Sequence, residues 1–327
     1  MVPPSWLGDT VIYQSIAESL ADNGFIVTYF SSLLSSIDSW TSKFNIVALP
    51  PLEALESTLD QFDIALVDRA TLHGFYKLSI SQASELAQKY IISAAHVLPP
   101  ELKVDITEHI ETRLPAEKAD KVKSLLGGNS EVTFSDNKEI TVLDHAVLYC
   151  SEKLKLDNVS STITLNPPRH LVKSRHPKRI ILCPYSSDTK KDWSIKSFEK
   201  LALRLEHNGF EPVFSVLPSD IERLPDSIKQ NYLVPVTKSL EELVSLIYES
   251  RALIAVDTGS GHLASLTGIP TITIYRKQGN KFRWRPAWGE NRIIRPKFQL
   301  KFKKHRIWSP FVSTRAVFRE LLSLIDK

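Results

Sequence analysis

Residues 253–275 read LIAVDTGSGHLASLTGIPTITIY, and this segment has the clearest structural pattern in the chain. An apolar run at 253–256 predicts a buried strand, and residues 257–268 predict a glycine turn that continues into a short helix. A second apolar run at 271–275 follows a proline and predicts another strand. A strand followed by a helix and a second strand is typical of a parallel sheet.

The same alternation extends through the second half of the chain. The apolar run 180–183 predicts a strand, and the periodicity of 195–205, before Gly209, predicts a helix. Ser239 and Glu242 have the spacing of a capping box, which predicts the start of another helix. Further strands are expected at 213–217 and 232–236. We therefore expect a doubly wound parallel sheet.

The first half shows the alternation more loosely. A helix is expected at 10–23, before Gly24, and strands are expected at 25–30, 46–49 and 64–67. These elements indicate a second α/β domain.

A linker is expected between the two halves. Residues 166–179, NPPRHLVKSRHPKR, contain three prolines and many charges. The predicted domains are therefore 1–165 and 180–327. A final helix, expected at 312–325, could pack on either domain.

The composition is that of a globular protein without a disulfide framework. The chain has 327 residues, 43% of them hydrophobic, which is enough for two cores. Its two cysteines, Cys150 and Cys183, lie in apolar runs, and a cage of thiolates around a metal is excluded. The first ten residues have neither a signal-peptide nor an anchor pattern, and no run of about 18 apolar residues occurs. We expect a cytoplasmic protein with at most peripheral membrane contact.

Positive charge is concentrated in one segment. Residues 276–306 contain twelve Lys and Arg and one acid, so a net charge of +4 divides into +11 there and −7 elsewhere. Such a cluster favours a polyanionic partner, such as nucleic acid, phospholipid headgroups or a phosphorylated substrate, although a solvated surface is an equally simple interpretation. The residues predicted to contact such a partner are Arg283, Arg285, Lys301, Lys303 and Lys304.

The glycine turn is the most specific candidate site. In open parallel sheets, ligands bind beyond the carboxyl ends of the strands. Glycines allow the backbone to approach a ligand, and the helix start offers N–H groups and the positive end of its dipole, an arrangement suited to a diphosphate. The alternative is a tight turn in which Asp257 or Thr258 caps the helix. The predicted site residues of this turn are Asp257, Thr258, Gly259, Ser260, Gly261 and His262.

Two other loops contain candidate residues. In the loop 184–193, Ser186 and Ser187 offer hydroxyls, and Lys190 and Lys191 offer ammonium groups that could neutralise a leaving phosphate, although solvated turns have the same composition.

The other loop is PSWLGD, residues 4–9. Its Gly8 permits close approach, and its Asp9 could be a general base or a helix cap.

Together the three loops resemble those of glycosyltransferase family 9, the bacterial ADP-heptose:lipopolysaccharide heptosyltransferases. PSWLGD followed by Gln14 and Ser15 is similar to the heptosyltransferase II branch. The residues that match the family's motifs are Gly8 and Asp9 for the catalytic base, Ser186, Ser187, Lys191 and Trp193 for the hydroxyl and lysine loop, and Asp257, Thr258, Gly259 and His262 for the donor-diphosphate turn.

The resemblance implies a GT-B fold, in which two Rossmann-like domains face a central cleft. It implies an inverting transfer of heptose from ADP-heptose to the lipopolysaccharide core, with Asp9 as general base and Lys191 assisting departure of the diphosphate. It implies a metal-independent enzyme without a cofactor, peripheral to the inner membrane and with no nucleic-acid partner.

The sequence departs from the family's pattern in three respects. Only Met1 and Val2 precede Pro3, where the family has a full strand. Gly261 stands where family members often have serine, and residues 70–160 show no acceptor signature.

Two alternatives remain open at the level of sequence. Gly259, Gly261 and Ala264 satisfy GxGxxA after a strand, which is compatible with an NADP-dependent oxidoreductase that uses Arg276 in place of the usual acid. An inactive relative that only binds a nucleotide or a lipid is the second alternative. Motifs for a P-loop, for HExxH metalloproteases and for GxSxG hydrolases are absent from the sequence.

Overall fold

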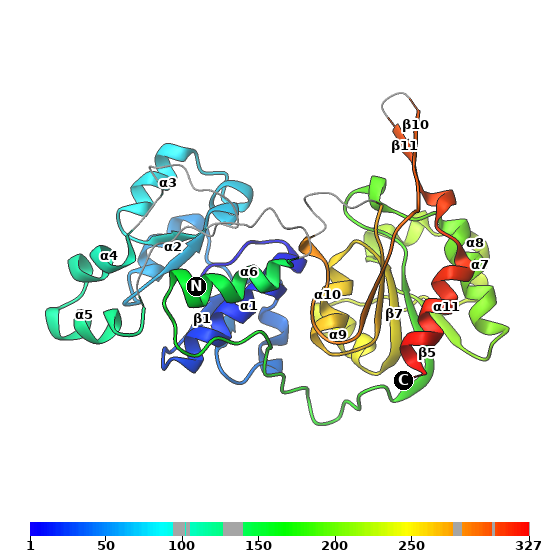
Figure 1. Ribbon diagram of the computed structural model, residues 1–327, viewed down its shortest axis with the longest axis horizontal. Helices are drawn as coiled ribbons and strands as arrows, with labels where there is room; N and C mark the ends of the chain where they lie inside the picture. Colours follow the sequence, from blue (N-terminus) through cyan, green and yellow to red (C-terminus); the bar gives the residue numbers. More distant parts are fainter. Residues whose placement is uncertain (94–101, 103–104, 127–139, 277–282, 303–304, 327) are drawn as a thin grey trace. The chain divides into compact units, whose positions relative to one another are not determined.

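The computed structural model describes residues 1–327 except 94–101, 103–104, 127–139, 277–282, 303–304 and 327. The chain divides into two compact units, Met1–Pro167 and Pro168–Lys327 (Figure 1). Each unit combines parallel strand pairing with helices, so the α/β class expected from the sequence is confirmed.

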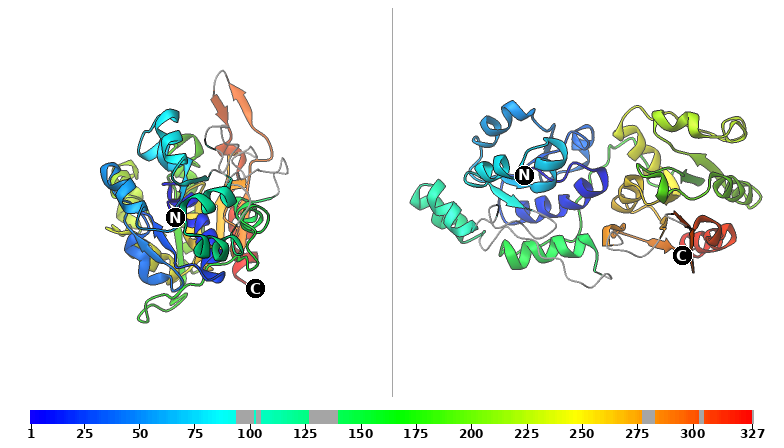
Figure 2. Two further views of the ribbon diagram at one scale, coloured as in Figure 1. Left: turned by 90° about the vertical axis from the view of Figure 1, so that its left-hand side faces the viewer. Right: turned by 90° about the horizontal axis from the view of Figure 1, so that it is seen from above.

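The C-terminal unit is built on one parallel sheet of five strands. Across the sheet the order is β6 (Glu211–Phe214), β5 (His176–Cys183), β7 (Ser250–Val256), β8 (Thr271–Ile274) and β9 (Asn291–Ile294). The helices of the unit are α7 (Ile195–Glu206), α8 (Asp226–Asn231), α9 (Leu240–Tyr248), α10 (Gly259–Leu266) and α11 (Thr314–Ile325). A hairpin of β10 (Leu300–Phe302) and β11 (His305–Ile307) extends away from the sheet (Figures 1 and 2).

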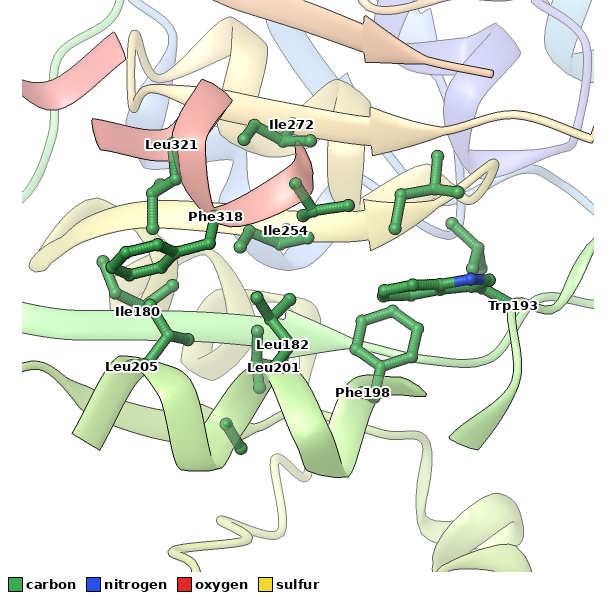
Figure 3. Close-up of a cluster of buried hydrophobic side chains, with 14 of the residues drawn as sticks. Ile180, Leu182, Trp193, Phe198, Leu201, Leu205, Ile254, Ile272, Phe318 and Leu321 are labelled. Carbon is green, nitrogen blue, oxygen red and sulfur yellow. The ribbon is translucent and has the colours of Figure 1, made fainter. Parts of the chain in front are cut away.

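Helices cover both faces of this sheet. On one face, α7 and α11 pack against each other and over alternate residues of the central strands, whereas α9 and α10 contact the other face at β7 (Figure 1). Figure 3 shows the first layer. Its buried side chains include Ile180 and Leu182 of β5, Ile254 of β7, Ile272 of β8, Leu201 and Leu205 of α7, and Phe318 and Leu321 of α11.

The final helix therefore packs on the sheet of its own unit. Val317, Leu321 and Leu324 of α11 are buried in the same cluster as the side chains of α7. The sequence left the partner of this helix open because its apolar stripe shows only that one face is buried.

Two elements differ from the sequence prediction. Strand β5 begins at His176, inside the predicted linker 166–179, because its charged first half still pairs with β7, where His176 lies opposite Ser250. The strand predicted at 232–236 is only a single bridge between Leu233 and Val213 at the sheet edge. An apolar run predicts only the part of a strand that is buried. It does not predict the solvated ends of a strand or the length of the pairing at a sheet edge.

The predicted capping box at Ser239 is half formed. The Ser239 hydroxyl accepts a hydrogen bond from the Glu242 amide at 3.2 Å, as expected. The Glu242 carboxylate, however, accepts from the amide of Lys238 at 2.6 Å, one residue before the N-cap.

The N-terminal unit has two pairs of parallel strands. These are β1 (Thr28–Phe30) with β2 (Asn45–Val47) and β3 (Leu66–Asp68) with β4 (Ile91–Ser93). Its helices are α1 (Leu7–Asp22), α2 (Leu52–Leu59), α3 (Ile80–Ala87), α4 (Ile106–Arg113), α5 (Ala116–Lys123) and α6 (Val142–Leu148).

The short first segment joins these two strand pairs. The Phe30 amide donates to the Met1 carbonyl at 2.9 Å, and the Val2 amide donates to the Leu66 carbonyl at 2.8 Å. The curtailed strand expected from the sequence is thus a two-residue bridge between β1 and β3. The helix α1 follows it and ends before Gly24, whose φ of +86° is readily adopted only by glycine.

The packing of α7 can be tested with two leucines of one helix. Leu201 is fully buried between α7 and the sheet, whereas Leu203 is 47% exposed. We expect Leu201→Ala to lower the free energy of unfolding by about 2–5 kcal/mol, because it leaves a cavity, and Leu203→Ala to change it by less than about 1 kcal/mol. Chemical denaturation measures both, and equal losses would contradict this packing.

Candidate functional site

The candidate site of the C-terminal unit lies where the strand order of its sheet reverses. From β5 the chain moves outward to β6, and it then returns past β5 to β7 on the other side. The loops that follow β5 and β7 therefore diverge, and a crevice at the carboxyl ends of the strands is the usual ligand position in such sheets. These two loops are 184–193 and 257–262, the ones selected from the sequence.

An ion pair connects the two loops. The Lys191 ammonium lies 2.9 Å from Asp257 Oδ2, and the two side chains are 25% and 18% exposed. The structure therefore brings together Lys191 and Asp257, which are far apart in the sequence, and leaves the pair accessible to a ligand.

The turn after β7 is not closed by a side-chain cap. Thr258 occupies the N-cap position of α10, but its hydroxyl makes no capping hydrogen bond, and the Asp257 carboxylate pairs with Lys191. The capping interpretation of these two residues is therefore wrong for their side chains. The helix begins at Gly259, so its N-terminal dipole points to the carboxyl edge of the sheet.

Two residues of the turn lie close to neighbouring strands. Gly261 is buried, and a Cβ at this position would lie 3.4 Å from Thr273 Oγ1 and 3.5 Å from Pro286 Cγ, which are ordinary van der Waals contacts. The Ser260 hydroxyl is near enough to Cys183, at the end of β5, to lower the pKa of that buried thiol slightly. The start of α10 therefore lies close to β5 and β8.

His262 is buried and neutral. Burial lowers its pKa to about 4, and the ring hydrogen-bonds with the Trp284 carbonyl, which raises the pKa slightly. Its Nδ1 atom has no partner among the described residues. A neutral imidazole can offer a diphosphate a hydrogen bond but no positive charge.

Tyr275 connects the segment after β8 to the ion pair. Its hydroxyl lies 3.2 Å from the Trp284 carbonyl and also hydrogen-bonds with Asp257. Burial and the charge of Asp257 raise the tyrosine pKa well above its usual range, so the hydroxyl remains protonated and acts as a donor. Neither Tyr275 nor Trp284 was selected from the sequence, although Tyr275 is the polar residue at the end of a predicted strand.

The loop after β5 is shaped by Asp192. Its Oδ1 accepts hydrogen bonds from the Ser186 amide at 2.8 Å and the Ser186 hydroxyl at 2.9 Å, and its Oδ2 lies 2.7 Å from Arg223. Ser186 therefore shapes the loop, whereas Ser187 is exposed.

Two tryptophans fasten the same loop to the C-terminal part of the chain. Trp193 is buried and donates to the Ser309 carbonyl at 3.1 Å, and Trp308 donates to the Lys190 carbonyl at 3.2 Å. The hydroxyls and lysines predicted from the sequence are therefore positioned by Asp192 and Trp308, which the sequence analysis did not select.

The predicted basic residues do not form one group. Arg283 and Arg285 are half-buried in the segment that packs along α10, and the charge of Arg285 slightly lowers the pKa of Tyr275. Lys301 lies on β10 of the hairpin. Lys303 and Lys304 lie outside the described residues.

In the N-terminal unit, Gly8 and Asp9 lie in the first turn of α1. The N-cap position is occupied by Trp6, so the interpretation of Asp9 as a cap is wrong. Asp9 is half-buried, and its charge contributes to the raised pKa of Asp68, the last residue of β3. Asp68 was not selected from the sequence.

The described residues contain no group of three or more His, Cys, Asp or Glu residues arranged to hold a metal ion. None of their helices has the length and apolar character needed to cross a bilayer.

Comparison with known families decides the class of protein. The model of glycosyltransferase family 9 (heptosyltransferase) matches residues 143–307, half of the chain. The chain belongs to glycosyltransferase family 9. It is therefore a glycosyltransferase of the heptosyltransferase type, and the oxidoreductase interpretation is wrong. No curated protein matches the chain in sequence.

Solved structures of this family have the same fold. A family 9 glycosyltransferase from Veillonella parvula is 15% identical with a TM-score of 0.66, and the match covers 99% of this chain and 95% of that one. E. coli ADP-heptose lipopolysaccharide heptosyltransferase II is 17% identical with a TM-score of 0.64, over 99% and 97% of the two chains. The E. coli heptosyltransferase WaaC with ADP is 13% identical with a TM-score of 0.63, over 98% of both. The GT-B fold predicted from the sequence is thus confirmed for this family 9 chain.

The neutral state of His262 predicts a pH dependence of stability in this enzyme. Because its pKa falls from 6.5 to about 4 on folding, the folded state binds fewer protons than the unfolded chain between these values. Stability from this group is complete above about pH 6.5 and is lost as the pH falls toward 4. We expect His262→Gln to reduce the loss of stability between pH 7 and pH 5 by about 1–3 kcal/mol.

Thermal unfolding at several pH values measures this difference. The exposed His207 provides the control, because His207→Gln should leave the profile unchanged. A His262→Gln profile that equals the wild-type profile would show that this histidine is not held neutral.

Proposed function

We propose that this family 9 glycosyltransferase transfers heptose from ADP-heptose to the inner core of lipopolysaccharide, with inversion at the anomeric carbon. The observation that carries the proposal is the Lys191–Asp257 ion pair at the switch point of the sheet, beside the N-terminus of α10. A cation, a helix dipole and exposed hydroxyls at one edge suit a nucleoside diphosphate.

In this proposal the C-terminal unit binds the donor. The Lys191 ammonium exchanges its contact with Asp257 for the diphosphate, and the hydroxyls of Ser187 and Thr258 and the amides at the start of α10 add hydrogen bonds. The exchange is feasible because a partly exposed ion pair contributes only about 1 kcal/mol or less. Preorganised donors to a leaving group are each worth roughly 3–4 kcal/mol in enzymes where they have been removed.

The N-terminal unit supplies the base. The Asp9 carboxylate takes the proton of an acceptor hydroxyl while that oxygen forms a bond to the anomeric carbon of the sugar. The bond from this carbon to the diphosphate breaks, and ADP leaves with the electron pair. Attack opposite the leaving group inverts the configuration, and Lys191 compensates the charge that develops on ADP, so no step requires a metal ion.

The names of the similar structures support the choice of donor. WaaC was solved with ADP and with ADP-2-deoxy-2-fluoro heptose, and heptosyltransferase II is named for ADP-heptose and lipopolysaccharide. We extend both to this chain as donor and acceptor class.

Peripheral contact with an anionic membrane at the cytoplasmic side is part of the proposal. The hairpin β10–β11 belongs to the segment with a net charge of +11. Around it Phe298, Leu300 and Ile307 are exposed. Apolar side chains among cations are typical of surfaces that bind anionic bilayers, where each cation adds about 1 kcal/mol.

Replacement of Lys191 tests donor binding. We expect Lys191→Ala to weaken ADP binding by about 10-fold or more, since it removes a charge-assisted contact to the diphosphate. Lys190→Ala, which removes the neighbouring exposed ammonium, should change the affinity by less than about threefold. Calorimetric titration with ADP measures both affinities. Thermal shifts with ADP, UDP, GDP and CMP show which nucleobase the donor site prefers. A preference for UDP would contradict the choice of ADP-heptose.

Replacement of Asp9 tests the chemistry. We expect Asp9→Asn to lower turnover by about 10²–10⁴-fold, the usual contribution of a general base, while ADP binding stays within about twofold of wild type. Release of ADP from ADP-heptose in the presence of heptose-free lipopolysaccharide is the assay. Unchanged turnover in Asp9→Asn would refute Asp9 as the base. Absence of turnover in the wild type would support the alternative that this chain is an inactive relative that only binds a nucleotide or a lipid.

A further inference from the structure

A second carboxyl group of the N-terminal unit is buried within electrostatic reach of the proposed base. Asp68 is the last residue of β3, and its side chain is only 1% exposed. Its Oδ1 accepts a hydrogen bond from the Ala70 amide at 2.7 Å. Among the described residues, no donor reaches its buried Oδ2 with ordinary hydrogen-bond geometry, although the Tyr13 hydroxyl is near enough to lower the carboxyl pKa slightly.

Backbone contacts hold Asp68 and Asp9 at the same edge of the N-terminal unit. The Asp68 amide donates to the Val2 carbonyl at 2.7 Å, and Thr71, three residues after Asp68, donates its hydroxyl to the Pro3 carbonyl. The segment fixed in this way leads directly into the first turn of α1, which contains Asp9. The position of Asp9 is therefore tied to the end of β3 at two points.

The surroundings of Asp68 offer little positive charge. Asp9 and Tyr13 face it from α1, Tyr29 from β1, and Tyr149 from the turn after α6. Burial and neighbouring negative charges raise the pKa values of all three tyrosines, so they remain neutral.

Within the described chain Asp68 forms no ion pair, and Arg69 has only a small effect on it. Burial, with a contribution from Asp9, raises the pKa of Asp68 from 3.8 to about 7. A carboxyl group that gains its charge near neutral pH beside a second carboxylate is typical of functional sites.

We propose that Asp68 is a positioning residue of the transfer reaction, whose buried carboxyl ionises beside Asp9 and makes that carboxylate a stronger base. This rests on the proposed function, in which Asp9 accepts the acceptor proton. Two interacting carboxyls release their protons in two steps. In the first step Asp9 loses its proton while the buried Asp68 keeps its own. In the second step, near pH 7, Asp68 loses its proton, and its new negative charge raises the affinity of Asp9 for a proton.

The pH profile of kcat/KM tests this coupling. In the wild type we expect kcat/KM to rise as Asp68 ionises around pH 7, because a more basic carboxylate removes the acceptor proton more readily. Asp68→Asn, which resembles the protonated form, should lack this rise and should be about 3- to 10-fold less active than wild type above pH 8. ADP release from ADP-heptose with heptose-free lipopolysaccharide gives the rates.

A matched control removes a charge from the same helix. Asp22→Asn lies 13 residues from Asp9 on α1, about 20 Å along the helix axis. This variant should retain the rise near pH 7. A rise that persists in Asp68→Asn would overturn the proposal, as would its loss in Asp22→Asn.

Thermal unfolding supplies a readout that does not depend on activity. Because the pKa of Asp68 is raised, the folded state binds more protons than the unfolded chain between about pH 4 and 7, and the stability from this group falls as the pH rises through that range. Asp68→Asn should remove this fall. Asp9→Asn should move it to lower pH, since it removes a negative charge that raises the pKa of Asp68.

These outcomes separate the two proposals. If Asp9→Asn retains turnover but still moves the stability profile, the base assignment fails while the coupling stands. If Asp9→Asn abolishes turnover but leaves the stability profile of Asp68 unchanged, the base assignment stands and the coupling is refuted. The second result can be obtained even if Asp68→Asn does not fold.

Discussion

The hydrogen bonds between β5 and β7 organise the C-terminal unit of this enzyme. They pair Ile180–Cys183 with Ala252–Ala255, segments that are some seventy residues apart, and they put both strands in the centre of the sheet. Because the pairing is parallel, both strands end at the same edge. The loops 184–193 and 257–262 therefore meet there, and the Lys191–Asp257 ion pair follows from that register.

Two buried titratable groups at this edge are neutral. Burial keeps His262 and Tyr275 neutral, and both are used to hold the segment after β8 through the Trp284 carbonyl. The Lys191–Asp257 pair, by contrast, is partly exposed. A ligand that binds Lys191 must replace its contact with Asp257, and this partly exposed ion pair contributes little stability. The neutral His262 and Tyr275 can stay in place during that exchange.

In the N-terminal unit, hydrogen bonds of the first two residues join two short strand pairs. Met1 and Val2 form these hydrogen bonds with Phe30, Leu66 and Asp68. This bridge positions the start of α1. It also places Asp68 in a buried position near Asp9, where two carboxyls influence each other. These hydrogen bonds therefore support the feature on which the proposed base depends.

The sequence by itself determined the alternation of strands and helices, the turn 257–262 and the candidate residues Asp9, Lys191 and Asp257, because apolar periodicity and glycine turns are local properties of the chain. Strand β5 begins at His176 and residues 232–236 form only a bridge, since solvated strand ends and sheet edges have no apolar pattern. Only the tertiary structure decided that Gly261 and His262 are buried, that Asp192, Tyr275 and Trp284 shape the site, and that Asp68 is buried within electrostatic reach of Asp9. The physical reason is that burial and electrostatic coupling depend on which distant strands pair, and the local sequence around each residue does not contain that information.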